Sequence, residues 1–150
     1  MSYHFNTVKA YLQDLDLVVD DEDTDEGLVV VSDENRGINH LIVDCEDPIL
    51  IVEQAIIPIP NNPGNLFRRL LEINRTLIHG AFALDEETGT ILFRDTLRLE
   101  TLDRSELEGS ITALELALAE NASELLEYSK CLQTKCEKLY LLTDLTNTKE

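Results

Sequence analysis

Basic residues are scarce in this chain, which has 12 lysines and arginines against 30 aspartates and glutamates and a formal net charge of −18. The deficit is uneven: the net charge is −12 over residues 1–60 (2 bases, 14 acids), −7 over residues 61–128 (6 and 13) and +1 over residues 129–150 (4 and 3). An acidic field repels nucleic acid and anionic membrane surfaces, so we exclude both as partners. The charge suits a protein that holds basic or aggregation-prone partners, and solubility alone is the competing explanation.

Long apolar runs and cysteine are also scarce. No stretch approaches the ~18 uncharged apolar residues of a membrane-spanning helix. The first residues, Met1–Phe5, lack the basic and apolar regions of a secretory signal. The three cysteines, Cys45, Cys131 and Cys136, are an odd number without framework spacing. These absences favour a reduced, cytoplasmic protein.

The hydrophobic content is nevertheless 43%, which is sufficient for a folded core despite the charge. At 150 residues we expect one domain over residues 1–150. Its core is predicted at about residues 5–127, followed by a C-terminal helical extension over 128–150 whose last residues, Thr143–Glu150, form a frayed tail.

The first 60 residues predict one helix followed by strands. Apolar residues at helical spacing indicate a helix from Phe5 to Leu15. Pro58 cannot donate a ladder hydrogen bond, so the last strand ends there or lies on a sheet edge. It remains open whether the first two strand-like runs are separate strands. The four runs, which are rich in β-branched residues and separated by turn residues, are Leu15–Val19, Leu28–Val31, Ile38–Cys45 and Ile49–Ile59.

Residues 61–80 predict a second helix. Asn62 and Pro63 have the residue types of an N-cap and a first helical position. An apolar stripe with helical spacing runs over 66–78, and Asn74 is its one polar break. His79–Gly80 then ends the helix, with the glycine in the left-handed conformation.

A hairpin and a long helix complete the order of elements. Ala81–Leu84 and Ile91–Leu99 flank the turn-forming residues Asp85–Gly89. Asp103 and Glu106 have the spacing of a capping box in front of the long helix. The predicted order is therefore α-β-β-β(-β)-α-β-β-α, and helices segregated from a mostly antiparallel sheet define the α+β class.

The long helix carries two apolar lines, and the second, weaker one consists of Ala113, Leu116 and Ala117. Two lines make a wide stripe, so one side can pack on the sheet while the other contacts a partner subunit. We therefore assign Ala113, Leu116 and Ala117 to a homodimer interface. The competing interpretation is a helix that uses both lines against a broad sheet.

No residue pattern indicates a catalytic centre, so we predict no enzymatic activity and no cofactor. The serines lack a nucleophile elbow, and the chain has no glycine-rich phosphate-binding loop. No cysteine has a histidine near it in sequence, although folding can bring the two together. His4, His40 and His79 belong to three different predicted elements, which argues against a zinc site.

The acidic run Asp20–Gly27 is the candidate for a metal site. Aligned with a calcium-binding EF-hand loop, its glycine takes position 6. Glu22 at position 1 is atypical, however, and Asp33 at position 12 is too short for bidentate ligation. We therefore predict no metal site and interpret the run as a solvated β-turn whose charges discourage edge pairing.

Three charged residues are candidates for partner binding: Arg68, Arg75 and Asp95. The alternation of its strand places Asp95 on the apolar face, where an unpaired carboxylate is costly. The cost is avoided if the carboxylate accepts a hydrogen bond, is exposed by a β-bulge or lies in a groove. Arg68 and Arg75 lie seven residues apart on one helix face, with Glu72 between them. That spacing favours ion pairing, and the other possibility is that the arginines anchor a partner's carboxylates.

The run Leu66–Asn74 entering Gly80–Leu84, followed by the strand Ile91–Arg94 and the helix Leu107–Leu118, resembles the YbjN family. That family is related in fold to type III secretion chaperones of the Tir-chaperone group, and the resemblance spans residues 5–127. It implies a strongly twisted antiparallel sheet, a homodimer and no enzymatic activity. Secretion chaperones of this fold hold a client segment extended over apolar patches.

We therefore expect a non-enzymatic, chaperone-like or regulatory protein that binds a polypeptide segment of a partner, by strand addition or in a helix-binding groove. The alternative is an acidic regulator that binds a metal ion or small molecule through residues 20–26 together with Asp33 or Asp95.

Overall fold

The computed structural model describes the backbone of residues 3–147 and the side chains of residues 4–129. Within that range, three α-helices and six strands follow one another in the predicted order, α-β-β-β-β-α-β-β-α. The first half therefore contains four strands. The elements are α1 (Tyr3–Asp14), β1 (Val18–Asp23), β2 (Leu28–Asp33), a short 3-10 helix (Glu34–Arg36), β3 (Ile38–Glu46), β4 (Ile49–Pro58), α2 (Leu66–Asn74), β5 (Ala81–Asp85), β6 (Thr90–Arg98) and α3 (Arg104–Asn147).

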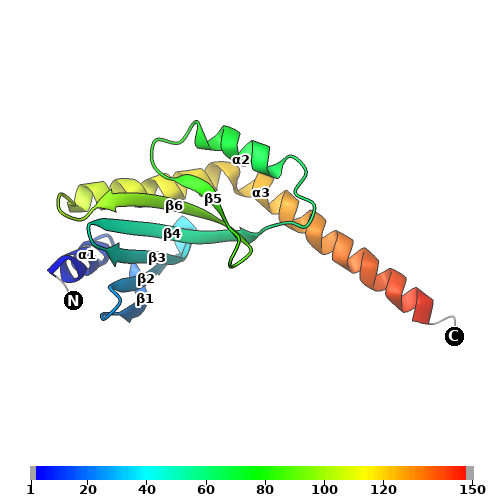
Figure 1. Cartoon of the computed structure of the whole chain (residues 1–150), viewed down its shortest axis with the longest axis horizontal. Coiled ribbons are helices and arrows are strands. Elements are labelled where there is room, and N and C mark those ends of the chain that lie inside the picture. Colours follow the sequence, from blue (N-terminus) through cyan, green and yellow to red (C-terminus); the bar gives the residue numbers. More distant parts are fainter. Residues whose placement is uncertain (1–2, 148–150) are drawn as a thin grey trace.

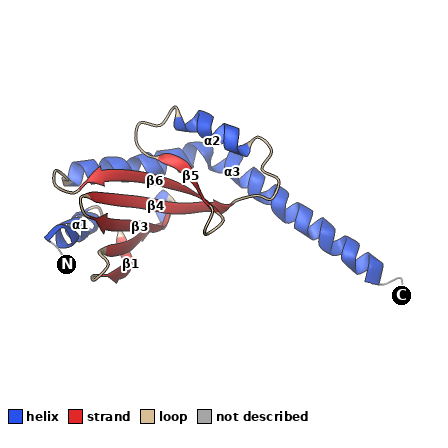
Figure 2. Cartoon of the chain, in the orientation of Figure 1, coloured by secondary structure: helices blue, strands red, loops and turns tan. Residues whose placement is uncertain are grey.

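All six strands belong to one antiparallel sheet with the order β1-β2-β3-β4-β6-β5 (Figure 1). The second hairpin therefore joins the first four strands through β6, and β5 becomes an edge strand. β4 lies inside the sheet and ends at Pro58, as its missing donor requires. The chain between β4 and β5 carries α2, which lies beside β5 and α3 (Figures 1 and 2).

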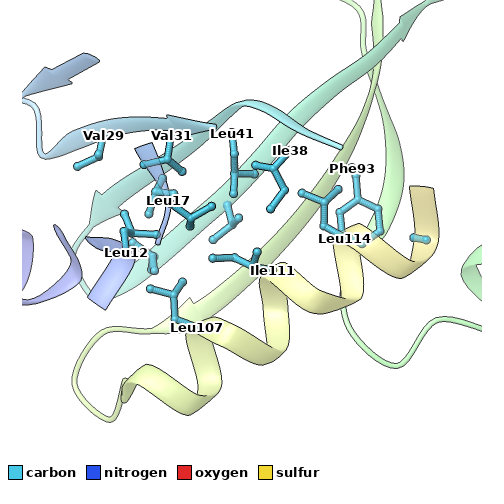
Figure 3. Packing of buried hydrophobic residues seen from close by; sticks show 14 of the residues in the cluster. Leu12, Leu17, Val29, Val31, Ile38, Leu41, Phe93, Leu107, Ile111 and Leu114 are labelled. Carbon is cyan, nitrogen blue, oxygen red and sulfur yellow. The ribbon is translucent and has the colours of Figure 1, made fainter. Parts of the chain in front are cut away.

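One face of the sheet is covered by α1 and the first half of α3. Figure 3 shows Leu12 of α1 and Ile111 of α3 pointing toward Val31 and Leu41 of the sheet. These four side chains are fully buried, with relative exposures of 0%. Burying a side chain of this size contributes about 1.5–3 kcal/mol, so this interface is the main source of stability for the fold.

β1 begins later than predicted, at Val18 rather than Leu15, and extends to Asp23. The acidic residues 20–23 therefore belong to an edge strand, and the turn is confined to residues 24–27. No alternation of apolar and polar residues indicates this strand, because β1 pairs with β2 through backbone bonds while all its side chains except Val19 are exposed.

α2 is shorter than predicted at both ends. It begins at Leu66, because residues 61–62 form a bend, and Gly64, with a positive φ of 55°, forms a turn with Asn65. Asn62 and Pro63 therefore do not open the helix. At the other end α2 stops at Asn74, so the apolar residues 77 and 78 lie in a loop and not on a buried helix face.

α3 begins where the capping box predicts, and the side chain of Asp103 accepts a hydrogen bond from the backbone N–H of Glu106 at 2.8 Å. The helix continues to Asn147, so residues 143–147 are helical rather than part of a tail. Beyond its last contacts with the core, the C-terminal part of α3 extends alone, away from the sheet (Figure 1). The side chains of Cys131 and Cys136 lie outside the described residues.

Cys45 provides a test of the core. Its side chain is 3% exposed, and burial, with a smaller contribution from Asp44, raises the pKa of its thiol from 9.0 to about 11. The folded state therefore favours the protonated thiol. This preference stabilises the folded state fully below about pH 9, and the stabilisation is lost as the pH rises toward about 11. We expect a Cys131→Ser, Cys136→Ser variant to react with a thiolate-specific reagent at neutral pH only after unfolding. Rapid reaction of the native variant would contradict this burial.

Candidate functional site

Helix α2 carries apolar side chains on two sides. Leu66, Leu70 and Ile73 are buried, with exposures of at most 5%. Leu71, on the outer side, is 71% exposed. In a monomeric protein, an amphipathic helix needs apolar residues only on the side that packs against the core. An exposed leucine on the outer side therefore makes the surfaces next to α2 candidates for an interaction site.

The first surface is a recess of about 220 Å³ between α2 and β5, called here the α2–β5 recess. No charged residue lines it, and it borders an edge strand. An edge strand next to an apolar recess is suited to receive a further strand with its alternate side chains. The lining residues are Phe67, Leu70, Leu71, Asn74, Phe82, Ala83 and Leu84.

Asn74 connects α2 to the edge of β5. Its Nδ2 donates to the carbonyl oxygen of Phe82 at 3.1 Å, and its Oδ1 accepts from the Phe82 N–H at 2.8 Å. The side-chain amide thus replaces the backbone of a neighbouring strand at this point. Alternate residues of a strand direct their backbone groups to the same edge, so Leu84 directs its own pair there as well. The polar break in the predicted helix marks the position where the helix ends.

Replacing Asn74 by alanine is expected to reduce the free energy of unfolding by about 1–3 kcal/mol, because it leaves a donor and an acceptor of the β5 edge without partners. Urea denaturation measures this loss. Asn74→Asp is the control, because it retains the acceptor but not the donor. Its free energy of unfolding should lie between those of the parent and the alanine variant. Equal stability of the alanine variant and the parent would show that water satisfies Phe82 equally well.

The second surface is a groove of about 580 Å³ between the loop of residues 76–79 and the outer face of the first half of α3, called here the loop–α3 groove. Ile78 from the loop is 92% exposed, and Leu116 from α3 is 54% exposed. Glu108 and Glu120 also line the groove. Large apolar side chains at such exposure, gathered in one groove, are typical of interaction sites.

The residues that the sequence assigned to a dimer interface are placed differently from one another. Ala113 and Leu116 line the loop–α3 groove, and both are accessible. Ala117 also lines the groove, but it is 1% exposed and packs in the core, so it offers little surface to a partner. The second apolar line thus lies partly at the core and partly at the groove, and its role in a homodimer interface stays a prediction.

The arginines of α2 form ion pairs within the chain. Nε of Arg68 lies 3.3 Å from Glu72, at the predicted spacing, and the Arg68 side chain is 83% exposed. Arg69 makes the shorter contact: its Nε donates to both carboxylate oxygens of Glu124 on α3, at 2.8 and 3.1 Å. This hydrogen bond and the charge of Glu124 raise the pKa of Arg69. Arg75 is exposed beyond the end of α2 and has no ion pair with any described residue.

Asp95 is satisfied within the chain. The hydroxyl of Ser110, which is 2% exposed on α3, donates to Asp95 Oδ2 at 2.7 Å. The other carboxylate oxygen accepts from the backbone N–H of Thr96 at 2.9 Å. The hydrogen-bond explanation of this apolar-face carboxylate is thus confirmed, and it joins β6 to α3. Asp95 lines neither the α2–β5 recess nor the loop–α3 groove.

The acidic run does not assemble a metal site in the described part of the chain. Among these residues there is no group of three or more His, Cys, Asp or Glu that could hold an ion. Asp20 accepts a hydrogen bond from Ser32, and Asp23 accepts from the backbone of Asp25 and Glu26 to close a turn. In the same range, no helix has both the length and the hydropathy needed to cross a membrane.

This open antiparallel sheet with three helices has the α+β fold of type III secretion chaperones. Similar solved structures include YbjN from E. coli, a putative transcription regulator (12% identity, TM-score 0.61, 80% of this chain and 92% of that one). Another is the chaperone–effector complex of HopA1 and SchA (19%, 0.55, 76% and 89%). A third is the Yersinia pestis secretion chaperone SycH bound to a fragment of YscM2 (14%, 0.55, 77% and 98%). At these identities the similarity shows the fold alone.

Residues 1–131 match the family model CesT_Tir_1, and the chain belongs to this type III chaperone family. The resemblance drawn from residues 66–84 and the elements that follow is thereby confirmed. No curated protein matches the chain.

Proposed function

We propose that this chain is a non-enzymatic, cytoplasmic, chaperone-like protein that binds a polypeptide segment of a partner protein. The observation that carries the proposal is the pair of apolar surfaces flanking α2, where Leu71 is 71% and Ile78 92% exposed. Burying one such side chain contributes about 1.5–3 kcal/mol, so a segment that covers the loop–α3 groove gains enough to offset part of its ordering. The complexes of SchA with HopA1 and of SycH with YscM2 support the proposal, because they are proteins of this fold bound to a partner polypeptide.

The acidic surface has a role in this proposal. A chaperone-like protein must remain soluble while it carries apolar segments, and a net charge of −18 favours that. The same charge attracts basic segments from a distance and repels acidic ones.

A homodimer is the second part of the proposal, and we place its interface at the α2–β5 recess. Two copies of an acidic chain repel each other, and a two-fold interface brings the same patch of both copies together. An uncharged surface is therefore favoured for the interface, and the α2–β5 recess has no charged lining residue. The loop–α3 groove carries Glu108 and Glu120, so the proposed interface moves away from Ala113 and Leu116.

An array of overlapping peptides, probed with the full chain at micromolar concentration, tests polypeptide binding. We expect binding to a subset of apolar peptides, weakened in an Ile78→Ser variant. Leu126→Ser is the matched control, because Leu126 is 51% exposed on α3 and lines neither surface. If the chain binds none of the peptides, the proposed function is wrong.

A further inference from the structure

We propose that the loop–α3 groove selects extended partner segments in which apolar residues are flanked by lysine or arginine. The inference rests on the proposed function, polypeptide binding, and adds the location of the site and the chemistry of the partner.

The charge lining the groove is of one sign. Glu108 and Glu120 are its carboxylates, no lysine or arginine lines it, and His79 is the remaining ionisable residue. Neither carboxylate forms an ion pair with a described residue. A segment with basic ends would supply the missing counter-charges.

Two other carboxylates of the same helix have partners within the chain. Glu115 pairs with Arg36 at 2.9 Å, and Glu124 pairs with Arg69 at 2.8 Å. The arginines of the chain thus neutralise carboxylates that face the chain's own elements. The two carboxylates at the groove, like Glu127 outside it, form no ion pair with a described residue, and they differ from Glu127 in lying beside exposed apolar side chains.

The spacing of the groove residues defines the segment. Glu108 and Glu120 are twelve residues apart, which corresponds to about 18 Å along a helix. Leu116 lies between them on α3, and Ile78 lines the groove from the loop. An extended chain covers about 18 Å with roughly five or six residues. A matching segment therefore has two or three apolar residues between basic residues about five or six positions apart.

A second copy of this chain is a poor occupant for the same reason. Residues 1–128 carry 27 acids and 8 bases, so another copy would bring mainly like charge to an acidic groove. Each carboxylate on an exposed rim is expected to change the dissociation constant by about two- to fivefold, while the apolar centre contributes most of the affinity.

Three labelled heptapeptides test the inference by fluorescence anisotropy with the full chain. They share a leucine-rich centre and end in lysine, glutamine or glutamate. We expect the lysine peptide to bind best and the glutamate peptide worst. The variant E108Q/E120Q should remove this order without weakening the glutamine peptide. Glu127→Gln, an exposed change on α3 outside the groove, should preserve it.

A second pair of variants tests the apolar centre. Ile78→Ser, Leu116→Ser should weaken all three peptides at least tenfold, and Leu126→Ser should not. Binding that is unchanged in both groove variants would overturn the inference while leaving the proposed function standing. A change of oligomeric state in the Ile78→Ser, Leu116→Ser variant would also overturn it, since the groove would then be an interface between copies. Failure of the wild type to bind any peptide, here and on the array, would instead refute the proposed function.

Discussion

Replacing Gly80 by alanine is expected to reduce the free energy of unfolding by roughly 2–5 kcal/mol, the largest effect of any single methyl group that we predict. Gly80 has a φ of 74°, in the left-handed region that disfavours a side chain. An added Cβ would lie 2.5 Å from Cε1 and Cζ of Phe93. That ring is 2% exposed and packs edge-on against Phe82 at 5.4 Å, so it has little space to move.

Gly89→Ala separates the two causes. Gly89 has a similar φ of 67°, but an added Cβ there meets nothing within 4 Å. We expect Gly89→Ala to reduce the free energy of unfolding by about 1–2 kcal/mol, which is the cost of the left-handed backbone alone. Urea denaturation of both variants gives the difference. Equal losses would mean that the Phe93 ring yields easily, and that the junction between α2 and β5 is less tightly packed than described.

Replacing Leu71 by aspartate is expected to convert the proposed homodimer to a monomer. The change places one carboxylate of each copy at the α2–β5 recess, whose lining residues carry no charge, and burying it unpaired is costly. Loss of a central apolar contact typically costs at least 2 kcal/mol, which is about a thirtyfold weaker association. Since Leu71 is 71% exposed in the isolated chain, the urea midpoint of the monomer should hardly change.

Sedimentation velocity at several concentrations measures this effect. Leu126→Asp is the control, because it adds the same charge at an exposed leucine outside the α2–β5 recess. A wild type that is monomeric throughout would refute the homodimer. A dimer that survives Leu71→Asp but not a Leu116→Asp change would return the interface to α3, where the sequence first placed it.

The second hairpin and the start of α3 were predictable because their signals are local. The capping box at Asp103 and the turn residues 85–89 lie within a few positions of the boundaries that they determine. The first half shows where this fails. β1 pairs with β2 through backbone hydrogen bonds at an exposed edge of the sheet. Its side chains are mostly acidic and exposed, so they form no apolar pattern from which the strand can be predicted.

The candidate site was only partly predictable, because it is assembled from distant segments. The apolar stripe over 66–78 was read as one helix, which would have buried Ile78 against the core. Asn74 instead bonds to Phe82, ends the helix and releases Ile78 to the loop, where it is 92% exposed. Arg69 finds its partner Glu124 fifty-five residues away, a contact that helical spacing cannot reveal.

Hydrogen exchange of the full chain, with and without a saturating lysine-flanked peptide, tests the central claim most directly, because it detects both binding and its location. The account predicts slower exchange at residues 76–79 and over residues 105–120 of α3, where the peptide and the loop cover the helix face. Unchanged exchange at both segments, or protection confined to β1–β3, would contradict it.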